Sequence, residues 1–264
     1  MLGHSATVED RLDATGVAGH AAPRGVAAPA PRDPAIHPAD DGHPVPAPSP
    51  AVLDRLAGVD PSTRRVGYAA KRAVDVFGAA VGLVLLAPLL GLVGLAILIA
   101  DGRPILFRQP RAGRYGQAFT IVKFRTMQDG ADALRAGLRT HNEVAGGASF
   151  KMTHDPRVTR LGHVLRRTSI DELPQLWNVL RGEMSLVGPR PHPFDDLAGY
   201  VEWHYARLAM KPGMTGLWQV SARRETDFDR WVQQDLDYIR RWSPAFDVRL
   251  LLMTVPAVLR GSGR

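Results

Sequence analysis

The sequence contains no cysteine among its 264 residues. It therefore has no disulfide framework, no thiolate metal site and no cysteine nucleophile. It also lacks Gly-x-Gly-x-x-Gly, the P-loop, Gly-x-Ser-x-Gly and His-Glu-x-x-His, so the common nucleotide-binding and hydrolase motifs are absent. Any chemistry must come from carboxylates, hydroxyls, histidine, lysine or arginine.

Acidic residues are absent between Gly102 and Gln128, a stretch that holds six lysines and arginines. The whole chain carries a formal charge of +7 and has a pI of about 10.2. Such an excess favours an anionic partner, which can be nucleic acid, an acidic membrane surface or a phosphorylated substrate. Beside an anionic leaflet each basic residue contributes about 1 kcal/mol. The stretch is therefore expected to hold the following residues against a bilayer.

Residues 1–61 lack any periodic apolar pattern and contain ten of the 21 prolines. This composition predicts a disordered Ala/Pro-rich tail, which we extend to residues 1–65. The first nine residues have neither the basic start nor the apolar run of a secretory signal. The histidines scattered in the tail are interpreted as solvated rather than metal-binding; they are His4, His20, His37 and His43.

Charged and strongly polar side chains are absent from Val76 to Ala100, a run of 25 residues. Buried core helices rarely contain apolar runs of this length, so residues 66–102 are predicted to form a membrane helix. Pro88 divides the run into halves of 12 residues and predicts a kink. Each half reaches only about 18 Å, against a hydrocarbon core of roughly 30 Å.

The charges that flank this run favour a re-entrant helix, which enters one leaflet and returns to the same side. Basic residues lie on both sides, and the positive-inside rule draws both ends to the cytoplasm. A straight helix that crosses the bilayer with some tilt is the alternative. The flanking residues are Arg64, Arg65, Lys71 and Arg72 before the run and Arg103, Arg108, Arg111 and Arg114 after it.

Residues 103–264 are predicted to form a helix-rich α/β domain with a small sheet. Strands are expected at 105–107 and 118–124, with Gly113 and Gly116 in the turn between them. Apolar spacing predicts a last helix that packs on the core or lies in the membrane interface. The expected helices are 127–139, 158–167, 171–180, 194–210, 228–242 and 246–259.

The densest group of reactive side chains surrounds Asp171 and Glu172, in the first turn of a predicted helix that Thr168 or Ser169 can cap. Acids in this position often do no more than complement the helix dipole. Nearby arginines and free backbone N–H groups, however, make an oxyanion site and keep a carboxylate ionised. The two acids point about 100° apart, so they are expected to have different roles. The arginines are Arg166, Arg167 and Arg190.

Two further basic residues, Lys123 and Arg125, alternate along the second predicted strand. Alternate residues of a strand face the same side, so this pair is a candidate for joint phosphate binding. Solvated charges at a sheet edge are the alternative. Arg190 lies between two prolines, on a stiff loop that fixes the direction of its side chain or forms a simple surface turn.

Seven ordered blocks of this sequence strongly resemble the bacterial sugar transferase family, the monotopic polyprenyl-phosphate phosphoglycosyltransferases. The resemblance extends from about Lys71 to the C-terminus, and the part after Pro191 resembles the exopolysaccharide-priming branch. The blocks are Lys71-Arg72-x-x-Asp75, Pro88 in its apolar run, and residues 107–116, 123–127, 168–180, 184–191 and 211–220. One departure is Ala87, where many relatives have serine.

The resemblance implies a re-entrant helix broken near Pro88, a catalytic domain on the cytoplasmic side of the cytoplasmic membrane, and dependence on Mg²⁺. It assigns Asp171 as the nucleophile that attacks the sugar-linked phosphate of a nucleotide diphosphate sugar, expected to be a UDP-sugar. Glu172 then serves the metal or a proton, and Arg166 and Arg190 hold phosphates. The enzyme-bound phosphosugar is passed to polyprenyl (undecaprenyl) phosphate, which primes the synthesis of an exopolysaccharide or glycoconjugate.

Two other functions compete with this interpretation. A non-enzymatic, membrane-anchored basic module that binds anionic lipid or nucleic acid needs the positive charge but neither Asp171 nor Glu172. The sequence has no helix-turn-helix signature or aromatic-interleaved basic run, so nucleic acid is not expected as a partner. A membrane hydrolase of lipid diphosphates has no support from the ordered blocks. No pattern specifies the donor sugar, the polymer or the oligomeric state.

Overall fold

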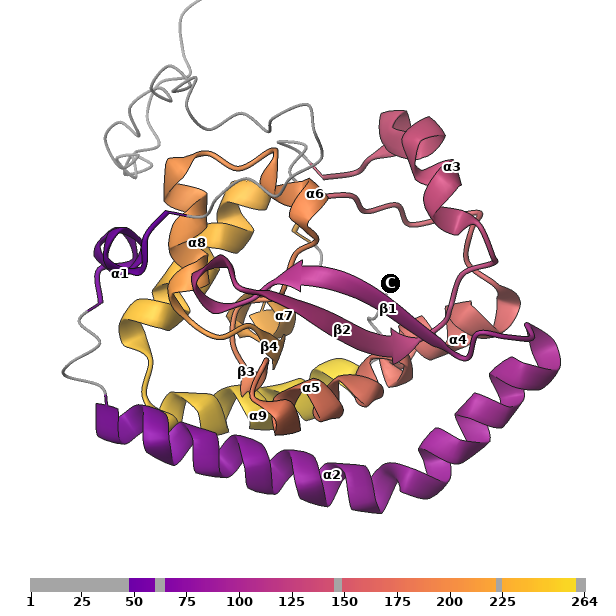
Figure 1. Cartoon of the computed structure of the whole chain (residues 1–264), viewed down its shortest axis with the longest axis horizontal. Coiled ribbons are helices and arrows are strands. Elements are labelled where there is room, and N and C mark those ends of the chain that lie inside the picture. The colour runs from indigo at the N-terminus through magenta and orange to yellow at the C-terminus, as the bar shows by residue number, and fades with distance from the viewer. Residues whose placement is uncertain (1–47, 60–64, 145–148, 222–224, 260–264) are drawn as a thin grey trace, which may run out of the picture. The chain divides into compact units, whose positions relative to one another are not determined.

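The computed structural model describes residues 48–59, 65–144, 149–221 and 225–259. These residues belong to one compact unit, residues 34–264, in which helices surround two small β-sheets (Figure 1). Most of the predicted tail, residues 1–47, lies outside the described ranges. The helix-rich fold with little sheet confirms the fold class expected from the sequence.

Helix α2 (Arg65–Ala100) contains the whole apolar run and is exposed along most of its length. Within the segment Val66–Ala100, the most apolar window of 18 residues has a mean hydropathy of 2.8 and is 11% buried, so by length and composition the segment could cross a membrane. The helix continues through Pro88 without interruption, and its ribbon changes direction along its length (Figure 1). Gly102 follows with φ 75°, a left-handed conformation that suits glycine after a helix.

Strands β1 (Leu106–Ala112) and β2 (Ala118–Phe124) form an antiparallel hairpin, in register from Leu106 opposite Phe124 to Ala112 opposite Ala118. The second strand has the predicted bounds, whereas the first is longer than expected and continues through Pro110. Proline is tolerated there because both strands of a two-stranded sheet are edge strands. The turn contains η3 (Arg114–Gly116).

A second sheet pairs β3 (Ser185–Val187) with β4 (Gly213–Thr215) in parallel. Strands of three residues give no recognisable alternation, which is why the sequence did not predict them. Their contact is so close that a Cβ on Gly213 would lie 2.0 Å from the backbone nitrogen of Gly188. Because the strands are parallel, the loops that follow them leave the sheet at the same end.

Most predicted helices are present with shifted bounds. The predicted helix at 171–180 begins as a 3₁₀ turn, and the one at 194–210 is divided into two short elements. The observed elements are α3 (Ala131–Leu138), η4 (Arg139–His141), α4 (Arg160–Arg167), η5 (Ile170–Gln175), α5 (Leu176–Arg181), α6 (Phe194–Leu197), η6 (Glu202–Ala209), α7 (Leu217–Ser221), α8 (Phe228–Arg241) and α9 (Pro244–Leu259).

Helix α1 (Pro50–Ala57) corrects the predicted extent of the disordered tail. Its side chains Leu53 and Ala57 are fully buried and belong to the largest apolar core, which also contains Phe228. Arg240 on α8 donates a hydrogen bond to the carbonyl of Ala57, 3.2 Å away. The prediction failed because the surrounding prolines masked a helix of only two turns, whose stability comes from tertiary burial.

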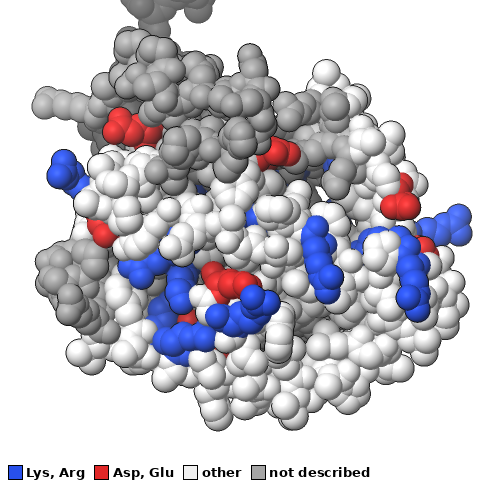
Figure 2. All heavy atoms as spheres, in the orientation of Figure 1, with Lys and Arg blue, Asp and Glu red and all other residues white. Residues whose placement is uncertain are grey.

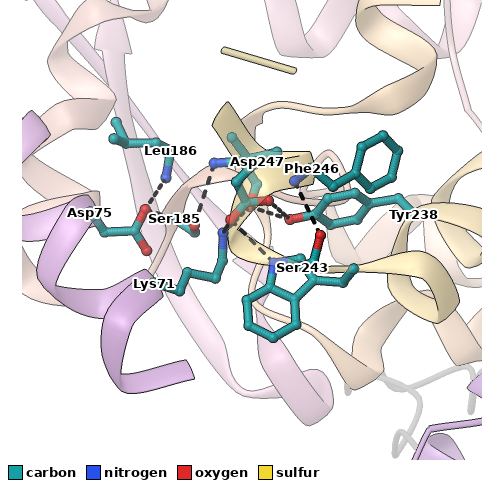
Figure 3. Close-up of polar contacts among 10 residues, drawn as sticks. Lys71, Asp75, Ser185, Leu186, Tyr238, Ser243, Phe246 and Asp247 are labelled. Atoms are coloured by element: carbon teal, nitrogen blue, oxygen red, sulfur yellow. Dashed lines mark hydrogen bonds and ion pairs between the residues drawn. The ribbon is translucent and has the colours of Figure 1, made fainter. Parts of the chain in front are cut away.

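Buried charges attach the beginning of α2 to β3 and α9 (Figure 3). Lys71 Nζ lies 2.6 Å from the Asp247 carboxylate and donates to the Val187 carbonyl at 2.9 Å. The Asp75 carboxylate accepts hydrogen bonds from Ser185 Oγ and Leu186 N, each 2.9 Å long. The apolar helix is therefore held to the domain by specific polar contacts at its basic end.

We predict that Lys71→Met lowers the free energy of unfolding by about 3 kcal/mol, because it leaves the carboxylate of Asp247 buried without its cation. The double variant Lys71→Met/Asp247→Asn should recover much of this loss, since the amide oxygen of asparagine accepts from Trp242 and its NH₂ group donates to the Tyr238 hydroxyl, which lies 3.1 Å from the Val187 carbonyl and can donate to it. Unfolding of the detergent-solubilised chain measures both. Equal stability of Lys71→Met and the unmodified protein would show that the pair contributes nothing.

Candidate functional site

A polar cavity of about 320 Å³ lies between the hairpin, η5 and the loop after β3. Its lining contains six lysines and arginines against four aspartates and glutamates, which leaves an excess of two positive charges. Figure 2 shows basic side chains gathered around acidic ones near the centre of one face. The charged residues of the lining include Arg111, Lys123, Arg166, Asp171, Glu172 and Arg190. Such a cavity suits a multiply charged anion.

The hairpin separates this cavity from an apolar groove of about 1150 Å³. Phe107 and Lys123 line the polar cavity, whereas their neighbours Leu106 and Val122 line the groove together with α2. The alternation follows from the strand geometry, in which successive side chains face opposite sides. The two-residue period of β1 and β2 thus places a polar surface and an apolar surface back to back.

Asp171 lies on η5, and its side chain lines the cavity while the residue is only 6% exposed. Burial, together with the neighbouring charge of Glu172, raises the pKa of this carboxyl group to about 6. Lys123, Arg166 and Arg190 oppose this increase. Asp171 is therefore a desolvated carboxylate that is ionised at neutral pH, the state required of a nucleophile.

Glu172 forms an ion pair with Arg190, with 2.5 Å between Oε1 and Nη2. The charge of Glu172 raises the pKa of the Arg190 guanidinium above its ordinary value. The Arg190 backbone is held in turn by Arg207, which is fully buried and donates to the Arg190 carbonyl at 3.1 Å. The two neighbouring acids thus differ in environment: Asp171 is desolvated, and Glu172 is paired with a cation.

Lys123 on β2 faces the two acids across the cavity. Burial, together with the nearby charges of Arg166 and Arg111, lowers the pKa of its ammonium group to about 8. Arg166, at the end of α4, donates from Nε to Thr126 Oγ1 at 2.9 Å. Burial also lowers the pKa of Arg166. These cations repel one another in a poorly solvated space, so an incoming phosphate relieves their repulsion.

Arg125 lies outside the cavity, contrary to the prediction that it faces the same side as Lys123. Strand β2 ends at Phe124, and the chain leaves the hairpin before Arg125. Its guanidinium donates instead to the backbone carbonyls of Asp101, Gly102 and Arg103, at 2.5, 2.8 and 2.9 Å. Arg125 therefore satisfies carbonyls at the end of α2, which would otherwise lack helical partners.

The expected helix cap at Thr168 or Ser169 is also absent. The hydroxyl of Thr168 donates back to the Val164 carbonyl at 2.9 Å, and Ser169 makes no capping hydrogen bond. Ser169 adopts φ 57°, a left-handed conformation that is uncommon outside glycine. The turn that leads into the acidic pair is therefore formed by backbone geometry rather than by a side-chain cap.

Several cavity residues were not assigned a role from the sequence. Arg111 on β1 donates to the Pro191 carbonyl at 3.1 Å and so joins the hairpin to the Arg190 loop. His192 is neutral at pH 7, because burial lowers its pKa to about 3. Trp218 and Gln219 line the cavity from helix α7, which follows β4. Arg111, Trp218 and Gln219 belong to the sequence blocks that resemble the sugar transferase family, but no role could be assigned to them from the sequence.

The fold and the site together define a class of protein: one that joins a long apolar helix to a cationic cavity with a buried carboxylate pair. Residues 66–261 match the bacterial sugar transferase family, and the chain belongs to this family.

Characterised relatives cover the same part of the chain. The galactosyl transferase CpsE of Streptococcus agalactiae is 44% identical over 198 residues, which are 74% of this chain and 43% of CpsE. The exopolysaccharide production protein ExoY of Rhizobium meliloti is 40% identical over 76% of this chain and 91% of its own. The UDP-glucose:undecaprenyl-phosphate glucose-1-phosphate transferase of Caulobacter vibrioides is 44% identical over 72% and 69%. The chain thus spans less than half of CpsE and most of ExoY.

We predict that Asp171→Asn stabilises the protein at pH 7 and has little effect near pH 4. The raised pKa means that the folded state holds the Asp171 proton more tightly than the unfolded state does, so stability falls as pH rises from about 4 to about 6 and then levels. Asparagine, which does not ionise, avoids this loss, on the order of 3 kcal/mol for a shift of roughly two units. Thermal unfolding across this pH range measures the difference. An equal effect at pH 4 and pH 7 would contradict the assignment.

Proposed function

We propose that the protein transfers a sugar 1-phosphate from a nucleotide diphosphate sugar, specifically a UDP-sugar, to polyprenyl (undecaprenyl) phosphate. The products are a polyprenyl-diphosphate sugar and a nucleoside monophosphate, and the reaction primes exopolysaccharide or glycoconjugate synthesis. The observation that carries the proposal is the buried pair Asp171 and Glu172 in a cationic cavity, in a chain of this family. The name of the Caulobacter relative describes the same class of reaction.

The Asp171 carboxylate carries the first step in this mechanism. One of its oxygens attacks the sugar-linked phosphorus, a new phosphorus–oxygen bond forms, and the bond to the nucleoside monophosphate breaks. An oxygen of the polyprenyl phosphate then attacks the same phosphorus and regenerates the free carboxylate. Arg190, Arg166 and Lys123 neutralise the phosphate oxygens and hold them in line, which is the main requirement of phosphoryl transfer.

The reaction is also proposed to require Mg²⁺. Within the described residues no group of three or more histidines, aspartates and glutamates could hold a metal ion. Magnesium, however, is commonly bound by one or two carboxylates together with substrate phosphates, and the pair Asp171 and Glu172 fits that arrangement. A bound Mg²⁺ would neutralise charge on the diphosphate. Glu172, on the same short helix as Asp171, is the residue suited to share this duty.

We further propose that α2 is a re-entrant helix and that the domain faces the cytoplasm at the inner membrane. The support is that both ends of α2 bind the same compact domain: Lys71 and Asp75 hold its beginning to β3 and α9, and Arg125 binds the carbonyls just after its end. A helix of 36 residues would extend about 54 Å if straight, and a crossing would place its ends on opposite sides of the bilayer. One domain cannot bind both of those ends.

The reaction is tested by incubating the purified chain with a UDP-hexose alone and measuring its intact mass. We predict that the unmodified protein gains the mass of a sugar phosphate, that Asp171→Asn does not, and that Glu172→Gln accumulates less. Excess chelator should prevent the gain, and added Mg²⁺ should restore it. Undecaprenyl phosphate should then remove the adduct and yield the lipid product. An adduct on Asp171→Asn would place the nucleophile elsewhere, and full activity in chelator would exclude the metal requirement.

The topology is tested with single cysteines at Ser49 and Thr140, exposed positions on either side of α2 in a chain without natural cysteine. We predict that an impermeant maleimide labels neither position in intact cells and both positions after permeabilisation, because both flanks lie in the cytoplasm. The permeabilised sample is the control for reactivity. Labelling of one position alone in intact cells would show a single crossing.

A further inference from the structure

Trp218 and Gln219 bring two polar atoms into the cavity wall without partners from the described residues. Trp218 is 8% exposed and Gln219 is 4% exposed, so both are more than nine-tenths buried. The indole Nε1 of Trp218 and the amide Oε1 of Gln219 are buried and make no hydrogen bond. Both residues line the cavity that contains Asp171. Buried polar atoms normally have partners, so two exceptions on adjacent residues that line one cavity point to a ligand.

The amide of Gln219 is oriented so that its oxygen remains free. Its Nε2 donates to the Met214 carbonyl at 3.1 Å, which leaves Oε1 as an acceptor. Gly216 leaves room for this oxygen, because a Cβ at position 216 would lie 3.2 Å from Oε1 of Gln219 and 2.5 Å from the carbonyl oxygen of Gly188. The side chain of residue 219 is therefore held in place before any ligand arrives.

The indole of Trp218 is held equally firmly. Its ring stacks on Trp231, with 4.8 Å between centroids and 11° between planes. The two indoles differ in their N–H groups: Nε1 of Trp231 donates to the Glu225 carbonyl at 3.1 Å, whereas that of Trp218 has no partner in the described chain. Within the described residues, Trp218 thus has an unpaired donor, and the next residue, Gln219, has an unpaired acceptor.

The parallel strands explain why this pair lies in the same cavity as the charged residues. Arg190 is in the loop after β3, and Trp218 and Gln219 are in the segment after β4. Carboxyl ends of parallel strands lie at one edge of a sheet, a common location for ligands. The first loop supplies a cation for phosphate, and the second supplies a neutral donor and a neutral acceptor.

We propose that Trp218 and Gln219 form a specificity site that binds an uncharged polar group of the nucleotide sugar through one donated and one accepted hydrogen bond. This inference rests on the proposed function. The matching chemistry is a group that offers both an acceptor and a donor, which occurs in a hexosyl hydroxyl and at the edge of a uracil base. A buried polar pair discriminates strongly, because a ligand without the matching group leaves both atoms unpaired.

The test compares variants of the full chain that change only these atoms. Trp218→Phe removes the N–H and keeps an aromatic ring, and Gln219→Met removes the amide at similar size. Trp242→Phe is the matched control, because it removes an indole N–H that already donates to Asp247 at 3.2 Å, on a residue that does not line the cavity. We expect the first two variants to raise the Kd for UDP-hexose about tenfold, whereas the control should leave it within twofold. Thermal unfolding of each variant accompanies the titrations.

Two further titrations identify the group that is bound. If Trp218→Phe and Gln219→Met weaken the binding of UMP as much as the binding of UDP-hexose, the pair binds the base. If UMP binding is unchanged and UDP-hexose binding falls, the pair binds the sugar, and the preference between UDP-glucose and UDP-galactose should shift. Either result supports the site.

The site is overturned if both variants bind UDP-hexose within twofold of the unmodified protein, or if Trp242→Phe weakens binding as much as they do. The adduct measurement separates this failure from failure of the proposed function. Should the unmodified protein gain no sugar phosphate from UDP-hexose, the proposed reaction itself is wrong.

Discussion

The contact between α2 and β3 is the constraint on which the rest of the structure depends. Lys71 binds the Val187 carbonyl and the Asp247 carboxylate, and Asp75 binds the Leu186 N–H. The same strand leads directly into the loop of Arg190. An apolar helix packed by dispersion alone can slide, whereas buried ion pairs and hydrogen bonds are satisfied in one register only. Helix α2 therefore fixes the position of β3, and β3 fixes the position of Arg190 in the site.

The close approach of Gly188 and Gly213 fixes how β4 packs against β3 in the second sheet. Gly188 and Gly213 are in direct backbone contact, and Gly213 N donates to the Pro189 carbonyl at 2.8 Å. Side chains at either position would separate β3 from β4 and move Arg190 away from Trp218 and Gln219. The parallel pairing thus unites a charged part and a neutral part of one cavity, although the two segments are about 28 residues apart in the chain.

Burial and charge act against each other at the acidic pair. Desolvation raises the pKa of Asp171, and the surrounding cations limit the rise, so the carboxylate is ionised near neutral pH while remaining poorly hydrated. The same burial lowers the pKa of Lys123 to about 8, so its charge also depends on the balance within the cavity. Such a site is suited to exchange one anionic ligand for another with little help from water.

The sequence by itself determined the apolar helix, the antiparallel hairpin and the main helices, and it identified Asp171, Glu172, Arg166 and Arg190 as candidate site residues, which the structure places in one cavity. These features depend on local periodicity, composition and motif order, which are properties of neighbouring residues. Tertiary structure alone decided that β3 pairs with β4, that α1 is a buried helix, that Arg125 binds the end of α2 and that Trp218 and Gln219 enter the cavity. Each of these depends on contacts between segments distant in the chain, and a linear pattern carries no information about which buried atoms find a partner.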